Sequence, residues 1–318
     1  MNVGIFEVIQ PGPLTTVQDL GRYGYQQYGI PVSGAMDNYA LRVANLLVGN
    51  NEGEAGLEIT LLGLQLRLLK DTVVAISGAD LSPTLNNNPL PMWEAVVVGC
   101  GDVISFHWPK RGCRSYLAVA GGIDIPKVMG SSSTYMKSRI GGIEGRPLRV
   151  GDRLKSGEAR PRILERKLPP QYIPEYRNQS ELRVILGPQD DHFTEKGIYD
   201  FLHSEYTIST EADRVGYRLQ GPRIEHKTGA DIISDGIPLG AVQVPGDGLP
   251  IILMADRQTT GGYAKIAIVI TVDVPKLAQA KPGDKIRFLQ TTEEEAHQAL
   301  REYEQTIHTL KYCIQQNH

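Results

Sequence analysis

The densest group of side chains that could do chemistry lies between residues 234 and 265 of this 318-residue chain. The segment reads SDGIPLGAVQVPGDGLPIILMADRQTTGGYAK, and its paired glycines let the backbone approach a ligand closely. A hairpin corner held by polar side chains would account for Thr259 and Thr260, but not for so many functional groups. We favour a site for a small amide or carbamate that bears a carboxylate. The candidate residues are Asp235, Gln243, Asp256, Gln258, Tyr263 and Lys265.

A second polar segment, residues 11–37, reads PGPLTTVQDLGRYGYQQYGIPVSGAMD and precedes a predicted helix. A helix N-terminus favours anions, and Arg22 could clamp a carboxylate through two parallel N–H donors. An internal ion pair between Asp19 and Arg22 explains the arginine equally well. For Asp37 we favour a simpler role, as the N-cap of the helix that follows.

A third, smaller group spans residues 130–149, GSSSTYMKSRIGGIEGRPLR. The run from Ser131 to Thr134 could form a loop rich in hydrogen-bond donors, and Arg139 and Arg146 are candidate anion contacts. A flexible surface loop is the favoured interpretation of this segment.

Motifs that would bind a nucleotide or carry out hydrolysis are absent from the sequence. It contains no G-x-x-x-x-G-K-[ST] loop, no G-x-G-x-x-G turn between strand and helix, no G-x-S-x-G elbow and no H-E-x-x-H pair. Lys137 follows Met136, as at biotin attachment sites, but its flanks are unusual and we interpret it as an ordinary lysine. We therefore expect no cofactor to be bound by this chain alone. ATP or biotin, if either takes part, is expected on another chain.

A metal site is not expected either. The tightest carboxylate–imidazole cluster is Asp190-Asp191-His192, which fits an acidic turn before a helix better than a metal site. The cysteines, Cys100, Cys113 and Cys313, are odd in number and widely spaced. They predict neither a disulfide framework nor a zinc cluster, and suit reduced thiols in a cytoplasmic protein.

The charge balance and the apolar runs exclude two classes of partner. There are 33 Lys and Arg residues against 36 Asp and Glu, a net charge of −3, whereas a nucleic-acid binder should show a basic footprint. The longest apolar runs, residues 249–255 and 266–272, are far shorter than the roughly 20 residues of a membrane-spanning helix. We expect a cytoplasmic protein with neither nucleic-acid nor membrane partners.

Short strand-like runs rich in Val, Ile, Leu or Thr dominate the secondary-structure pattern. Three helices are predicted: residues 37–48, a short one after Thr194, and a C-terminal one that starts with a Thr292–Glu295 capping box. The C-terminal helix has an apolar stripe of Ala296, Leu300, Tyr303, Ile307 and Leu310. Many short strands with few helices predict a mainly β fold of barrels or sandwiches. The predicted strands span residues 3–10, 56–70, 72–79, 102–108, 114–120, 182–187, 206–210, 251–255, 266–272 and 285–289.

Two domains are the natural expectation for a chain of this length. The strand pattern lapses where prolines and charges cluster, so we predict domains at residues 1–157 and 181–318, joined by a Pro-rich linker at 158–180. A repeated Gly-Asp pair before a strand, at residues 101–102, 151–152 and 283–284, hints at two related halves. In each pair we expect glycine to take a positive φ angle and aspartate to bond its own backbone.

Three segments together resemble a known family. TTVQDLGRYGYQQYGIPVSGAMD, GSSSTYMKSRIGGIEGRPL and SDGIPLGAVQVPGDGLPIILMADRQTTGGYAKIA are similar to signature stretches of the biotin-dependent carboxyltransferase-like family, also called allophanate hydrolase subunit 2-like. Its stand-alone bacterial members include the C subunit of 5-oxoprolinase. The resemblance extends from about Phe6 to Leu289.

This resemblance implies two tandem cyclophilin-like β-barrel domains, with the C-terminal helix as an extension. It also implies partnership with two other 5-oxoprolinase proteins, a kinase-inhibitor-like one of the B type and one of the A type. Such assemblies open 5-oxoproline, a small lactam, to glutamate at the expense of ATP, and this chain is expected to be inactive alone.

The lactam chemistry suggests roles for the candidate residues. Water attack builds charge on the carbonyl oxygen, and the ring nitrogen is protonated as it leaves. Asp256 or Asp235 would act as base or acid. Gln243, Gln258 and Tyr263 would hold the amide, and Lys265 or Arg22 would hold the carboxylate.

Two other functions compete with the lactam hydrolase. The first is carboxyl transfer from carboxybiotin to urea or a similar acceptor, but the fused relatives that do this carry biotin domains for which 318 residues leave no room. The second is a binding protein that antagonises a histidine-kinase-inhibitor-like partner. This role is compatible with the enzymatic one, because the same interface could serve both.

Overall fold

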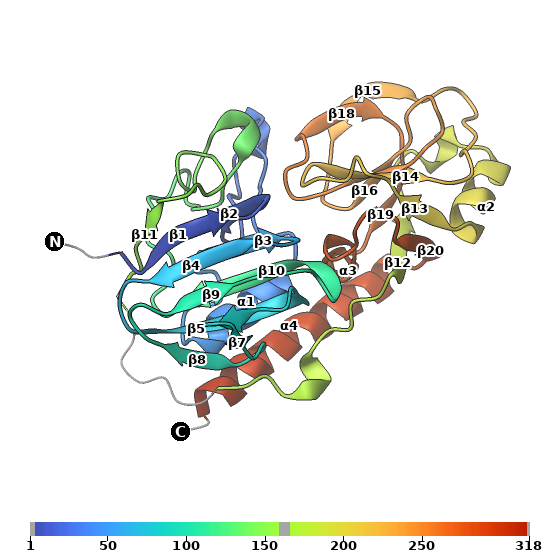
Figure 1. The fold of residues 1–318 in the computed structure, drawn as a ribbon. Coiled ribbons are helices and arrows are strands. Elements are labelled where there is room, and N and C mark those ends of the chain that lie inside the picture. Colours follow the sequence, from blue (N-terminus) through green and yellow to red (C-terminus); the bar gives the residue numbers. More distant parts are fainter. Residues whose placement is uncertain (1–3, 159–165, 317–318) are drawn as a thin grey trace. The chain divides into compact units, whose positions relative to one another are not determined.

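The computed structural model describes residues 4–158 and 166–316 and confirms the mainly β fold class. The chain forms two compact units (Figure 1). The first unit comprises Met1–Arg22, Ser33–Tyr176 and Gln305–His318, and the second comprises Tyr23–Val32 and Arg177–Glu304. Part of the predicted linker, residues 159–165, lies outside the described residues, while residues 166–176 group with the first unit. The ranges 1–157, 158–180 and 181–318 remain a prediction of domain boundaries.

Two antiparallel sheets build the first unit. The six-stranded sheet has the order β11-β1-β4-β9-β6-β7, and the five-stranded sheet has the order β2-β3-β10-β5-β8. The strands of the first sheet are β1 (Phe6–Pro11), β4 (Leu64–Leu68), β6 (Thr84–Leu85), β7 (Asn88–Pro89), β9 (Val103–Ser105) and β11 (Arg153–Leu154). Those of the second sheet are β2 (Leu14–Gln18), β3 (Gly56–Thr60), β5 (Thr72–Asp80), β8 (Ala95–Val98) and β10 (Arg111–Val119).

The two sheets share one hydrophobic core, to which both contribute alternate residues. In β4 the side chains of Leu64, Leu66 and Leu68 are buried, and in β3 Leu57 and Ile59 join the same cluster. Each such side chain contributes about 1.5–3 kcal/mol by leaving water. The period-two pattern read from the sequence therefore decides which face of each strand points inward.

The predicted strand at residues 56–70 is wrong as a single element, because the chain turns in its middle. Leu61 and Gly63 have φ angles of 68° and 87°, which a continuous strand does not allow. The run separates into β3 and β4, which lie in different sheets. The hydrophobic pattern did not indicate this turn, because Leu61, at the turn, is apolar like the strand residues on either side of it.

A closed barrel of seven strands forms the second unit, in the order β12-β19-β16-β17-β14-β13-β20 (Figure 1). The first strand pairs with the last in parallel, Gln179 opposite Lys285, and that pairing closes the barrel. A separate ribbon of β15 (Asp231–Gly236) and β18 (Thr260–Tyr263) belongs to the same unit. The barrel strands are β12 (Gln179–Leu186), β13 (Tyr206–Ile208), β14 (Gly216–Gln220), β16 (Ala241–Gln243), β17 (Ile251–Leu253), β19 (Lys265–Val269) and β20 (Lys285–Gln290).

The three predicted helices are confirmed, and each has an N-terminal cap, which was predicted for the first and the last. Asp37 accepts from Ala40 N at the start of α1 (Asn38–Leu47), and Thr194 accepts from Gly197 N at the start of α2 (Glu195–His203). At α4 (Glu293–Gln316) Thr292 and Glu295 exchange hydrogen bonds of 3.2 Å in both directions, as a capping box does. The predicted stripe is the least exposed face of α4, with Ile307 and Leu310 fully buried.

The expectation of only three helices is wrong, because a fourth, α3 (Val274–Ala278), follows β19. Its five residues are too few to show a helical period. Single turns of 3-10 helix also occur at η1 (Gln26–Tyr28), η2 (Met136–Ser138), η3 (Pro170–Tyr172), η4 (Asp190–His192) and η5 (Thr271–Asp273).

The three Gly-Asp pairs form the same turn in both units, as predicted. The glycines have φ angles of 91°, 85° and 91°. Each aspartate accepts a hydrogen bond from the backbone N–H three residues earlier, at 2.7, 2.7 and 3.0 Å. The turns lead directly into β9, β11 and β20.

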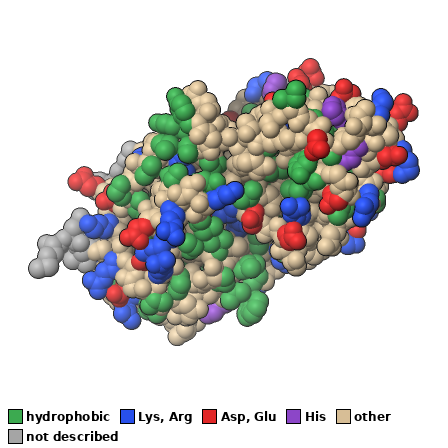
Figure 2. Space-filling model, turned by 90° about the horizontal axis from the view of Figure 1, so that it is seen from above, with side chains coloured by type: hydrophobic (Ala, Val, Ile, Leu, Met, Phe, Trp, Pro, Cys, Tyr) green, Lys and Arg blue, Asp and Glu red, His purple; other side chains and the backbone are tan. Residues whose placement is uncertain are grey.

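The surface carries charges of both signs. On the face shown in Figure 2, Lys and Arg side chains are interspersed with Asp and Glu side chains, in keeping with the net charge of −3. Among residues 4–158 and 166–316, no helix has the length and apolar character needed to cross a membrane.

Candidate functional site

Six of the seven predicted site residues belong to the second unit, where the ribbon and neighbouring barrel strands position them. Asp235 lies on β15 and pairs across the ribbon with Gly261 of β18. Gln243 ends β16 and pairs with Lys265 at the start of β19. These two pairings bring together residues that are up to thirty positions apart in the sequence.

The centre of this group is an ion pair between a buried ammonium and a half-exposed carboxylate. Lys265 is 1% exposed and Asp235 is 53% exposed, and Nζ lies 2.9 Å from Oδ2. The hydrogen bond from Lys265, together with one from Gly236 N, holds the pKa of Asp235 below its ordinary value. Gln189 donates to the same carboxylate oxygen at 3.5 Å and accepts from Lys265 N at 3.3 Å. Asp235 is thus an ionised base with part of its surface open to solvent.

Two side-chain amides converge beside this ion pair, at Gly261. A Cβ atom placed on Gly261 would lie 3.0 Å from Gln243 Nε2 and 3.6 Å from Gln258 Nε2. Gln243 is buried and donates from Nε2 to the main-chain oxygen of Tyr263 at 3.1 Å, whereas Gln258 is exposed. We call Gln189, Asp235, Gln243, Gln258 and Lys265 the ribbon cluster.

Tyr263 joins the ribbon cluster through its backbone. Its side chain is partly exposed, and its phenol oxygen makes no hydrogen bond within the described residues. The phenol is therefore available to a ligand.

Asp256 occupies a different environment, because both of its oxygens are bound by one arginine. Arg214 Nε and Nη2 lie 3.0 Å from its two carboxylate oxygens, and both side chains are buried. The backbone N of Asp256 also donates to Arg214 O at 2.8 Å. In the described part of the chain no hydrogen bond links Asp256 to Asp235, Gln243 or Lys265, so its geometry is that of a structural ion pair.

Arg22, the seventh predicted residue, belongs to the first unit and is fully buried there. Its Nη2 donates to the main-chain oxygen of Ser133 at 2.5 Å. A Cβ atom on Gly141 would lie 2.7 Å from that nitrogen and 2.1 Å from Ser133 O, so only glycine leaves room for this contact.

The neighbouring serine run is buried, which corrects the expectation of a flexible surface loop. Ser131 and Ser133 donate from their hydroxyls to Asp19 Oδ1 at 2.6 and 2.5 Å, and Ser132 N donates to Oδ2 at 2.6 Å. Gly21 N adds a fourth hydrogen bond at 2.8 Å. We call Asp19 and residues 131–133 the serine cluster. A loop that looked solvated from its composition is in fact ordered around one buried carboxylate.

The two arginines of the same segment differ in environment. Arg139 is exposed. Arg146 forms a bidentate pair with Asp152, at 2.8 and 3.0 Å, and also contacts Glu144. An anion at Arg146 would have to displace those carboxylates.

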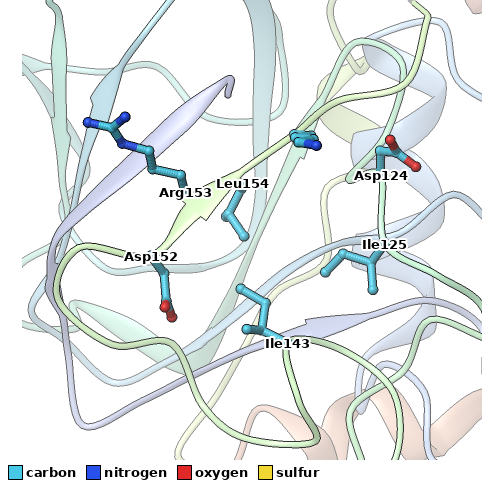
Figure 3. A pocket seen from close by; sticks show the side chains of 7 residues that line it. Asp124, Ile125, Ile143, Asp152, Arg153 and Leu154 are labelled. Carbon is cyan, nitrogen blue, oxygen red and sulfur yellow. The ribbon is translucent and has the colours of Figure 1, made fainter. Parts of the chain in front are cut away.

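A pocket of about 270 Å³ lies in the first unit, and none of the predicted site residues lines it. Ile125, Ile143 and Leu154 point toward one another in its floor, while Arg153 points away (Figure 3). Asp152, at its edge, is held by Arg146. The pocket therefore combines an apolar floor with two exposed charged side chains, Asp124 and Lys155.

Arg257 was missed by the sequence analysis, as was Gln189. Arg257 is 7% exposed, and its sequence context, ADRQTTGG, gives no sign that it is buried. Within residues 4–158 and 166–316, no three His, Cys, Asp or Glu side chains gather in a way that could hold a metal ion.

Sequence comparison identifies the class of protein to which this chain belongs. The features that the class must account for are the closed barrel, the two-sheet unit and the ribbon cluster. The carboxyltransferase domain, subdomain A and B, matches residues 28–290. The chain belongs to this family, as its signature segments suggested.

Individual relatives place the chain more narrowly within the family. It is 40% identical over 310 residues to the C subunit of 5-oxoprolinase from Escherichia coli, an alignment that covers 98% of this chain and 99% of that protein. It is 36% identical to the C subunit of 5-oxoprolinase from Haemophilus influenzae, with the same coverage.

Among solved structures, the chain is similar to urea amidolyase of Kluyveromyces lactis, at 33% identity and a TM-score of 0.89. That match covers 98% of this chain but 20% of the urea amidolyase, so the chain spans about a fifth of that protein.

Proposed function

We propose that this chain is one subunit of an ATP-dependent enzyme that opens 5-oxo-L-proline to L-glutamate. The observation that carries the proposal is the nearly end-to-end similarity to two proteins that are each named as the C subunit of a 5-oxoprolinase. In such an assembly the further partners are subunits of the A and B types, and the isolated chain is inactive. The absence of phosphate-binding motifs supports ATP binding by a partner chain.

The reaction defines what the site has to supply. Overall, 5-oxoproline, ATP and two waters give glutamate, ADP and phosphate. Phosphorylation of the lactam oxygen activates the carbonyl carbon, one water attacks that carbon, and the C–N bond breaks as the ring nitrogen takes up a proton. The second water then hydrolyses the resulting acyl phosphate, which releases phosphate and leaves glutamate. The site therefore needs a base for the water, donors and acceptors for the amide, and a contact for the carboxylate.

The ribbon cluster meets the first two of these needs. Asp235 is half-exposed and ionised, so it can accept a proton from water, and Lys265 keeps it ionised. Gln243, Gln258 and the Tyr263 phenol supply hydrogen bonds for the lactam amide. The geometry favours Asp235 over Asp256 as the base, because Asp235 is half-exposed whereas Asp256 is buried in a bidentate pair with Arg214.

Reconstitution tests this function. Mixing the three purified subunits with 5-oxoproline and ATP should release glutamate, and leaving out this chain should abolish the release. Asp235→Asn should lower kcat by about 10²-fold or more, the usual range for a general base, while Asp231→Asn on the same strand should leave kcat unchanged. Full glutamate release without this chain would contradict the proposal.

Carboxyl transfer to urea or a similar acceptor is the second candidate. The similarity to urea amidolyase across 98% of this chain favours it. It requires a biotinylated partner, so a biotin-bearing protein that co-purifies with this chain and supports urea-dependent consumption of carboxybiotin would decide for it. Antagonism of a kinase-inhibitor-like partner remains a prediction from the resemblance alone.

A further inference from the structure

Arg257 is a buried cation without an anion. Arg257 comes shortly after β17 in the chain. Its Nε donates to Ile237 O at 2.9 Å, and its Nη1 donates to Met254 O at 3.3 Å. Both partners are neutral carbonyls. Within the described residues no carboxylate lies at ion-pair distance from Arg257, and Nη2 makes no hydrogen bond.

Other buried cations of the second unit are compensated. Arg214 pairs with Asp256, and Lys265 pairs with Asp235. Burial without such a partner lowers the pKa of Arg257 to about 10, so the guanidinium is still charged at neutral pH. Keeping an uncompensated charge out of water is costly, and a bound anion would remove that cost.

Nη2 remains reachable from solvent. Although it has no hydrogen-bond partner among the described residues, it is not fully buried, so part of its surface is open. Nη1 and Nη2 form the edge of a guanidinium that suits a carboxylate.

Arg257 is connected to the ribbon cluster through Ile237. The residue that accepts from its Nε, Ile237, has its Cδ1 atom 2.6 Å from the Cβ position of Gly261, where the amides of Gln243 and Gln258 converge. Gln258 is the next residue in the chain. Arg257 and the two amides are therefore linked through Ile237 and through the chain itself.

We infer that Arg257 binds the carboxylate of the ligand, and that the site selects small cyclic amides that bear a carboxylate over those that do not. This inference rests on the proposed function. It assigns to Arg257 the contact with the ligand carboxylate, which the ribbon cluster does not supply. Lys265 is less suited to it, because Asp235 already neutralises its ammonium.

The test compares two substrates in the reconstituted assembly: 5-oxoproline and its carboxamide, 5-oxoprolinamide, which has the same ring without the charge. Arg257→Gln should raise KM for 5-oxoproline by about 10- to 100-fold, the value of one or two charge-assisted hydrogen bonds, and leave KM for the carboxamide within about twofold. Arg257→Lys should recover part of the loss. Arg223→Gln, at an exposed arginine of the same unit, is the matched control and should change neither value.

The outcomes separate this inference from the function on which it rests. Equal losses for both substrates would assign Arg257 a structural role and overturn the inference, even with turnover intact. If the wild-type assembly turns over neither substrate, the proposed function fails, and titration of the full chain with 5-oxoproline and 2-pyrrolidinone, followed by NMR, decides the inference. Carboxylate-dependent shifts that Arg257→Gln abolishes would support it, and their absence would overturn it.

Discussion

The serine cluster of the first unit and the ribbon cluster of the second are both built from glycine-rich polar segments, yet their carboxylates are held in opposite ways. Asp19 is buried and accepts four hydrogen bonds of 2.5 to 2.8 Å from its own chain. Asp235 accepts hydrogen bonds from Lys265, Gln189 and Gly236 N but remains half-exposed to solvent. A polar segment thus indicates a site only when its carboxylate keeps an unused face, and otherwise it indicates a buried structural link.

Asp256 is the sharpest case, because it lies in the second unit but is bound like Asp19. Asp256→Asn should destabilise the protein by about 3–5 kcal/mol, since it breaks the buried bidentate pair with Arg214. Denaturant unfolding measures this. A stable Asp256→Asn variant with no activity would instead return Asp256 to the candidate bases and break the comparison.

Asp19→Asn should cost about 2–3 kcal/mol. The amide retains one acceptor oxygen, but the remaining hydroxyl and N–H donors of the serine cluster lose a charged partner. The control is Asp124→Asn, an exposed aspartate of the same unit, which should change stability by less than about 0.5 kcal/mol. Equal unfolding midpoints for the two variants would show that the serine cluster does not stabilise the first unit.

Lowering the pH should reduce the stabilisation that buried, hydrogen-bonded carboxylates give to the fold. Asp273 allows a test of this direction. Burial opposes ionisation of Asp273, but hydrogen bonds from Arg183 and Lys276 outweigh it and lower the pKa below 3.8. A lowered pKa stabilises the fold above the unfolded-state pKa, and this stability is lost as pH falls through the folded-state pKa. Asp273→Asn should therefore cost about 1–2 kcal/mol between pH 5 and 7, and progressively less below about pH 4. A cost that grows on acidification would contradict this sign.

Gly261→Ala should have the smallest effect on stability, below about 1 kcal/mol, because Ile237 can move its terminal methyl group. The added methyl lies between the amides of Gln243 and Gln258, so lactam binding should weaken by more than the stability loss accounts for. Gly236→Ala, where a Cβ atom meets no neighbour, is the control. Unchanged KM in Gly261→Ala would show that the ligand does not use this corner.

Local features of the fold could be predicted from the sequence, and long-range ones could not. The caps at Asp37 and Thr292 and the three Gly-Asp turns depend on residues within a few positions of one another. The burial of Ser133 depends on Asp19, more than a hundred residues away, and no local pattern encodes that contact. The short helix α3 showed no period for a related reason, since five residues make little more than one turn.

The candidate site followed the same rule. Residue types in the segment 234–265 identified the ribbon cluster, because its members lie on strands close in sequence. The sequence could not tell Asp235 from Asp256, since the difference is the pairing of Asp256 with Arg214, 42 positions away. The sequence also could not identify Arg257 as a candidate, because what distinguishes it is burial without an anionic partner, which only the structure shows.

The parallel pairing of β12 with β20 has a consequence for how the protein is made. The barrel closes only when Lys285 reaches Gln179, so the ribosome must add about a hundred residues before the first strand finds its last neighbour. Because translation adds roughly 5–20 residues per second, one edge of β12 stays unpaired for several seconds. During synthesis that edge is a place where a chaperone or another protein of the assembly could bind before the barrel closes.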